Sequence, residues 1–385
     1  MKQLPLSGNS VFVRKEKLFA PLLNLIAILL LAAILFLLEL KNSTVTLVYT
    51  CCVFSLMAAS LNVTMGFMGQ LALGHCGFMA VGAYLGTYLA NALKASGFYT
   101  SAKDGTYLAV LLLCVVVGGL GAALVGFVVG MPALRLKGDY LAIITLGFGL
   151  IVTSVLNNIA RPVLYAEDCG LYISGKDVRA DYMILIVLLT ALCLALIFTF
   201  IRSKFGRALE SIRDDGIAAS ASGINISLYK VLGFTFSAFF AGVAGVFYAA
   251  MMSSLSTSSF AFSNSGIYNS VFIVVMVVMG GMGSLTGSIV TGVGMVLLNS
   301  VISKIPHSIP VLGALAKFPM LLYALVLVVF IMFRPRGIFG TGEFSLYRTL
   351  CCAPAFFKSL PSRIKEMAGK LSRKKSDELT EKEGE

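Results

Sequence analysis

The sequence predicts an all-α, polytopic transmembrane helical bundle of about ten spans, with helices broken at glycines. Of its 385 residues, 58% are hydrophobic and only 12% are charged, and mean hydropathy is +0.92. Long apolar runs recur along the chain, each near the roughly 20 residues that an α-helix needs to cross a bilayer. These runs show no alternation of polar and apolar residues, which favours helices over a closed β-barrel.

The predicted spans follow one another with short connections. They lie at 21–40, 44–64, 74–93, 106–130, 139–157, 181–201, 231–252, 268–282, 284–303 and 311–333. The first run follows a basic N-terminus, but it is too long for a signal-peptide core and lacks a small-residue cleavage site, which indicates a retained helix. The two runs within 268–303 could also form one broken element.

Charge divides the chain into an N-terminal arm at 1–17, a transmembrane domain at 18–340, and a basic then acidic tail at 341–385. An even number of spans places both termini on one side, and most of the 30 Lys and Arg residues then fall on that side. The positive-inside rule therefore predicts cytoplasmic termini, with the end of the tail disordered. The net charge of +12 follows from this topology, and no basic face interleaved with aromatic residues predicts nucleic-acid binding.

Residue types that carry catalysis or ion coupling are scarce. The eight Cys and two His residues show neither a disulfide framework nor zinc-like spacing. Carboxylates are nearly absent from the predicted spans, which disfavours an ion-coupled carrier. The phosphate-binding pattern G-x-x-x-x-G-K-[ST] is also missing. We therefore expect no enzyme activity and no bound cofactor, so energy for any transport would come from another protein.

Two glycine-rich segments, 66–71 and 280–285, share the pattern G-x-M-G-x-L, and each sits where an apolar run is interrupted. Broken helices in corresponding positions of two halves mark permeation sites in transporters, because bared backbone and helix ends can meet a polar substrate at membrane depth. Close helix packing through small residues is the alternative.

The most polar stretch of the apolar region is 202–223, which predicts a short helix outside the bilayer over 205–215. Phe205, Leu209 and Ile212 recur on one face of that helix. We expect this face to dock onto a partner, with an ordinary loop or a helix lying on the membrane surface as the alternative. The outer loop at 158–180 is either a docking surface for a soluble partner or a solvated loop.

Several blocks resemble one family. Residues 217–223 have the A-A-x-x-x-G spacing of the loop by which permease subunits of ABC importers engage their ATPases. Residues 66–84 and 138–147 resemble the G-x-x-G-Q-x-S-L-G-H and G-D-Y-L-A-I-x-T-L-G blocks of LivM-type branched-chain amino acid permeases. The F-G-R-A-L to A-G-x-A-G region at 205–249 and the R-P-x-G-L-x-G ending at 334–340 follow in the family's order, and the resemblance covers about 45–340.

This resemblance implies a permease subunit of an ABC importer in a bacterial inner membrane, carrying branched-chain or related hydrophobic amino acids. It implies as partners a second homologous permease, two ATPase subunits that bind ATP and Mg, an extracytoplasmic substrate-binding protein and membrane lipids. A permease for urea or short amides and a stand-alone channel are the alternatives. A membrane-embedded enzyme would need a cluster of acids, a metal site or a nucleophile that the sequence lacks.

Two sets of residues are the candidates for function. The expected ATPase-coupling residues are Phe205, Gly206, Arg207, Leu209, Glu210, Ile212, Arg213, Asp214, Ala218, Ala219 and Gly223. The expected translocation path, lined by helix ends and neutral polar groups, comprises Gly66, Gly69, Gln70, Gly74, His75, Asp139, Thr145, Asn157, Gly280, Gly283 and Ser284.

Some path candidates have a structural interpretation beside the functional one. The polar groups of Gln70, Thr145, Asn157 and Ser284 could instead hydrogen-bond between helices. His75 is interpreted as a packed or hydrogen-bonded residue rather than a proton donor, and Asp139 as a helix cap.

The chain departs from the family's pattern at three positions. Ala72 replaces a Ser, Ile217 replaces the Glu of the ATPase-binding loop, and Leu150 replaces an acidic residue. These losses of polar groups leave the exact substrate and the contacts with the ATPases open.

Overall fold

The computed structural model describes residues 42–98, 106–134, 140–164, 171, 176–252, 255, 260 and 270–302, together with 328, 330, 332–334, 337, 338 and 340. All of these lie in one compact unit, 29–343. The predicted span at 21–40, most of the span at 311–333, the arm, the tail and Asp139 lie outside the described residues. The side chain of Asn157 does so too.

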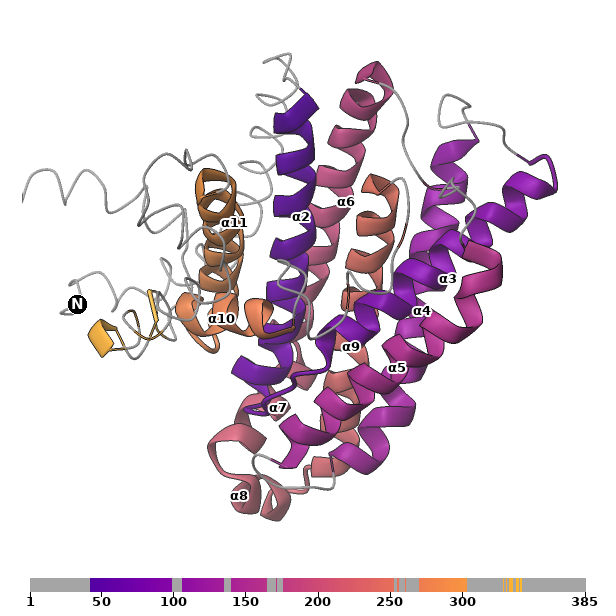
Figure 1. The fold of residues 1–385 in the computed structure, drawn as a ribbon. Coiled ribbons are helices and arrows are strands. Elements are labelled where there is room, and N and C mark those ends of the chain that lie inside the picture. The colour runs from indigo at the N-terminus through magenta and orange to yellow at the C-terminus, as the bar shows by residue number, and fades with distance from the viewer. Residues whose placement is uncertain are drawn as a thin grey trace, which may run out of the picture. The chain divides into compact units, whose positions relative to one another are not determined.

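Every regular element in this described part is a helix (Figure 1). In chain order the helices are α2 (Asn42–Asn62), the π-helical turn η2 (Val63–Phe67), α3 (His75–Ala95), α4 (Tyr107–Ala133), α5 (Tyr140–Leu164), α6 (Lys176–Arg202), α7 (Lys204–Asp214), α8 (Gly216–Ala221), α9 (Ile226–Met251), α10 (Ser270–Gly280) and α11 (Leu285–Ile302).

Five of these helical stretches are long and apolar enough to cross a membrane. They are Val45–Phe67, His75–Ala95, Tyr107–Ala133, Tyr182–Arg202 and Ile226–Met251, and each coincides with a predicted span. Three shorter apolar helices, Tyr140–Leu156, Ser270–Gly280 and Leu285–Ser300, occupy the places of three further predicted spans. The all-helical membrane fold is therefore confirmed, while the total of about ten spans stays a prediction.

Glycines bring α3, α4 and α9 into direct backbone contact. A Cβ at Gly82 of α3 would collide with the carbonyl of Gly242 on α9, and one at Gly118 of α4 would lie 2.9 Å from the carbonyl of Gly82. A Cβ at Gly245 would likewise meet the backbone of Met79. Small residues allow such close approach between membrane helices. The A-G-V-A-G sequence of α9 therefore allows this helix to pack closely against α3 and α4.

Helices α10 and α11 fold back on each other at a tight turn over 281–284. Gly280 lies against Gly287, and the Thr291 hydroxyl of α11 donates a hydrogen bond of 2.6 Å to the Met276 carbonyl of α10. With 11 residues, α10 is about 16 Å long at 1.5 Å per residue. The described part of α10 is shorter than the roughly 30 Å of a bilayer's hydrocarbon, and the two spans at 268–303 and the alternative of one broken element both stay predictions.

Candidate functional site

The polar segment after α6 folds into two short helices, α7 and α8, at one end of the bundle (Figure 1). Ser203 caps α7 by accepting the Phe205 N–H at 3.2 Å. Asp215 ends this helix, its N–H donating to the Ser211 carbonyl, and its carboxylate caps the next helix by accepting the N–H groups of Ile217 and Ala218 at 2.9 and 3.1 Å. The predicted helix at 205–215 is therefore confirmed as α7, and α8 is an additional helix that the capping power of Asp215 explains.

The apolar face of α7 is buried within the chain itself. Leu209 is 1% exposed and Ile212 is 6% exposed. A Cβ at Gly233 of α9 would stand 2.9 Å from a Leu209 methyl group, so that glycine makes room for the leucine. Gly206 is buried against the carbonyl of Ile201. The expectation that Leu209 and Ile212 fill a groove of the ATPase is therefore wrong, because their apolar surface already anchors α7 to the bundle.

The opposite side of the two helices faces away from the chain. Ile217, at the position of the family's Glu, is 85% exposed. Arg207, Asp214, Ala218 and Gly223 are also exposed. Phe205 is 46% exposed but stacks near Phe200 of α6, with ring centroids 6.2 Å apart. Glu210 is half-buried and Ala219 is buried, so these two residues lie beneath the exposed surface and do not form part of it.

The two G-x-M-G-x-L segments lie side by side, and the buried amide of Asn62 joins them. The Asn62 side chain donates to the Ser284 carbonyl at 2.9 Å and accepts the Gly283 N–H at 3.1 Å. A Cβ at Gly66 would collide with the Asn62 oxygen and approach the Gly283 nitrogen. Gly69 and Gly283 have φ of 69° and 92°, a backbone region that favours glycine. We call residues 66–69 and 280–284 the glycine junction.

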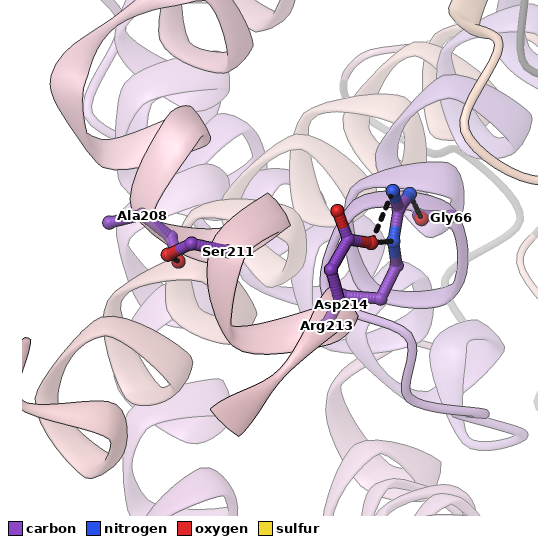
Figure 2. A network of polar contacts seen from close by, with 5 residues as sticks. All are labelled: Gly66, Ala208, Ser211, Arg213 and Asp214. Carbon is purple, nitrogen blue, oxygen red and sulfur yellow. Dashed lines mark hydrogen bonds and ion pairs between the residues drawn. The ribbon is translucent and has the colours of Figure 1, made fainter. Parts of the chain in front are cut away.

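Arg213, in the last turn of α7, reaches into this junction (Figure 2). Its Nη1 donates to the Gly66 carbonyl at 2.8 Å. Its Nε and Nη2 bind the neighbouring Asp214 carboxylate at 3.0 and 2.9 Å. The aliphatic stem of Arg213 crosses Gly69, where a Cβ would stand 2.7 Å from Cγ. The coupling segment and the first glycine segment are therefore in direct contact.

The R-P-R-G-I-F-G block closes the second side of the junction. The N–H of Ile338 donates to the Met279 carbonyl at 2.9 Å. A Cβ at Gly281 would stand 2.5 Å from the Gly340 carbonyl, and one at Gly337 would stand 2.5 Å from the Gly281 Cα. Gly280 packs on Gly287, and the Ser284 hydroxyl accepts the Gly287 N–H at 3.2 Å. Four of the blocks noted in the sequence thus meet at one place.

The remaining path candidates lie around the start of α3. Gly74 packs against the backbone of Thr145 on α5, whose hydroxyl accepts the Leu73 N–H at 3.1 Å. His75 is 1% exposed, and its Nε2 is 2.8 Å from the Ser60 hydroxyl. The Gln70 side-chain oxygen is buried without a hydrogen-bond partner among the described residues. A small cavity nearby is lined by Gly74, Gly77, Gly149, Thr153 and Ser270, among others.

The sequence profile of a family described as "Branched-chain amino acid transport system / permease component" matches residues 43–333. The chain belongs to this permease family. It is 32% identical to the Escherichia coli "High-affinity branched-chain amino acid transport system permease protein LivM", over 86% of this chain and 76% of that protein. The Salmonella typhimurium protein of the same name is 31% identical, with the same coverage.

A more distant relative is the Methanocaldococcus jannaschii "Probable branched-chain amino acid transport permease protein LivM", 23% identical over 74% of this chain and 90% of that protein. No solved structure matches the chain. The resemblance predicted from the sequence blocks is therefore confirmed. As a member of a transport permease family and a chain with membrane-capable helices, it is an integral membrane protein.

For this permease the structure also locates the first glycine segment. The segment begins within the last turn of a stretch, Val45–Phe67, that is long enough for a whole crossing. It therefore lies at a helix end, beside α7, and its place on the translocation path stays a prediction. Asn62, which joins the two segments, was absent from the predicted set; its signal was a polar amide at the end of an otherwise apolar run.

Proposed function

We propose that this chain is the permease subunit of an ABC importer for branched-chain or related hydrophobic amino acids. In this proposal α7 and α8 are the coupling helices that receive the ATPase subunits, which bind and hydrolyse ATP with Mg. A second homologous permease completes the transmembrane part, and an extracytoplasmic binding protein delivers the substrate. Both termini lie in the cytoplasm.

The observation that carries this proposal is the arrangement of α7 and α8. They sit at one end of the bundle (Figure 1), fixed from within by Leu209 and Ile212 and presenting an exposed surface outward. Ile217 is the strongest feature of that surface, because an apolar side chain that is 85% exposed gains free energy when a partner covers it. Full burial of such a side chain is worth about 1.5–3 kcal/mol.

Replacing Ile217 by a charged Asp tests this docking surface. Ile217→Asp should weaken association with the ATPases at least tenfold, since a tenfold change needs about 1.4 kcal/mol. Asn158→Asp, which adds the same charge at an exposed position of α5, is the matched control and should leave association unchanged. Affinity would be measured by pull-down of the ATPases across a concentration series. Equal association of both variants would remove α8 from the docking surface.

The subunit composition tests the proposal as a whole. The complex would be extracted from its native membrane in mild detergent and its subunits identified by mass spectrometry. Two ATPases and a second permease are expected, together with ATP-dependent uptake of leucine, isoleucine or valine in proteoliposomes containing the binding protein. A homo-oligomer that transports without ATP would support the channel alternative. ATP-driven uptake of urea with no uptake of amino acids would replace the substrate class.

A further inference from the structure

We propose that Arg213 is the positioning residue that transmits motion of α7 to the glycine junction, so that the ATPases act on the cytoplasmic end of the path through this one side chain. The inference rests on the proposed function, because it assigns to α7 the role of receiving the ATPases.

Arg213 lies on the side of α7 that faces the bundle. It follows Leu209 by one turn and therefore lies on the same face of α7 as that buried leucine. Its side chain is 31% exposed and runs toward the bundle, where its guanidinium binds the Gly66 carbonyl (Figure 2). Its aliphatic stem lies against Gly69. Arg213 and Arg207 are both exposed residues, but the guanidinium of Arg213 is turned inward and donates to the Gly66 carbonyl. The guanidinium of Arg213 is therefore engaged by the chain itself, at Gly66 and at Asp214.

The contact between Arg213 and Gly66 joins a cation to a helix end. Gly66 lies at the C-terminal end of η2, where carbonyl groups lack partners within the helix and the helix dipole favours a cation. A guanidinium is always protonated and presents several donors in a fixed plane. It can therefore bind the Gly66 carbonyl and the Asp214 carboxylate at the same time, as the hydrogen bonds show.

The Arg213 side chain reaches both glycine segments. A Cβ on Gly283 would stand 3.4 Å from Arg213 Nη1, which places the guanidinium at the turn between α10 and α11. Asn62 ties that turn to the end of α2 by two hydrogen bonds. Displacement of α7 therefore pulls on the end of η2 and, through Asn62, on the α10–α11 turn. Among the described side chains of α7, no other makes a hydrogen bond or an ion pair with this junction.

The test compares Arg213→Met with Lys204→Met in the whole complex, reconstituted in proteoliposomes with the binding protein. Lys204 is exposed on the same helix, so the control removes the same charge without touching the junction. We expect Arg213→Met to bind the ATPases and hydrolyse ATP, while amino acid uptake per ATP falls at least tenfold. Lys204→Met should stay within twofold of the unmodified complex. Arg213→Lys should recover part of the uptake, because it keeps the charge and one donor.

A second readout follows the junction itself. Ala72, just after the first glycine segment, is 1% exposed, so a thiol introduced by Ala72→Cys in a Cys-free background reports opening. ATP should raise its rate of labelling by a maleimide at least tenfold in the parent and in Lys204→Met, and less than twofold in Arg213→Met.

Three results would overturn the inference: uptake per ATP within twofold of the parent in Arg213→Met, an unchanged labelling response in that variant, or loss of ATPase binding, which would make Arg213 a docking or folding residue. Failure of the proposed function is distinct, because the unmodified complex would then lack ATPases before any variant is compared.

Discussion

Replacing Asn62 by Ala should loosen the glycine junction and lower the stability of the whole permease. The Asn62 side chain is fully buried, at 0% exposed, and its amide makes two hydrogen bonds to backbone more than 200 residues away. The amide orientation follows from its partners, since the Gly283 N–H can only donate and the Ser284 carbonyl can only accept. The substitution therefore leaves the Gly283 N–H buried without its acceptor, while the Ser284 carbonyl loses one donor and keeps the N–H and hydroxyl of Ser288.

The expected loss is about 2–3 kcal/mol. Hydrogen bonds in membrane proteins average about 0.6 kcal/mol each, but an orphaned buried polar group costs about 1–3 kcal/mol. At roughly 2–4 °C per kcal/mol for a domain of this class, the apparent Tm should fall by about 5 °C or more. The assay is thermal unfolding of the purified protein in one detergent. Unfolding would be detected with a thiol-reactive fluorescent dye, because the chain has no Trp for intrinsic fluorescence.

Asn158→Ala is the matched control for this prediction. Asn158 also makes an amide hydrogen bond, to the Ser154 carbonyl at 3.0 Å, but it is exposed. Water can replace that bond, so the Tm should change by less than about 2 °C. If the two variants melt within 1–2 °C of each other, the amide bridge contributes no special stability and the reasoning is refuted.

Two further predictions concern the glycine junction and the topology. Gly69→Leu and Gly283→Leu should each abolish uptake, because both positions need positive φ and a Cβ at Gly69 would displace Arg213. If the variant complex fails to assemble, these glycines serve helix packing. If it assembles but does not transport, they belong to the translocation path. In a Cys-free background, a membrane-impermeant thiol reagent should label Lys176→Cys in intact cells and should not label Ser211→Cys, and the reverse pattern would overturn the orientation of α7.

Local sequence signals predicted most of the helices but not their tertiary contacts. Apolar runs of the right length placed α3, α4 and α9 to within a few residues, and the spacing of Phe205, Leu209 and Ile212 predicted α7. The same spacing could not say what covers the apolar face. The apolar face of a helix shows the same spacing whether it packs on a partner protein or, as here, on Gly233 of the same chain. Periodicity shows that a face is buried but not what buries it.

The glycine junction shows the same division. The repeated G-x-M-G-x-L pattern correctly marked two segments of unusual backbone, as the positive φ of Gly69 and Gly283 confirms. Their adjacency depends on Asn62 and on Arg213, contacts between residues far apart in the chain that no local pattern encodes. Of the path candidates, Thr145 makes a hydrogen bond to another segment, accepting the Leu73 N–H, whereas the Ser284 hydroxyl accepts the Gly287 N–H at the start of its own helix.

The direct backbone contacts among α3, α4 and α9 determine which parts of the permease can move. Where Gly82, Gly118 and Gly242 meet, no layer of side chains separates the helices, so sliding would drive peptide groups into one another. We therefore expect these three helices to move together as one rigid unit. The α10–α11 hairpin is held through other residues, the Asn62 amide and the backbone contacts of Gly66 and Gly281, so substitutions at the glycine junction should leave the packing of α3, α4 and α9 intact.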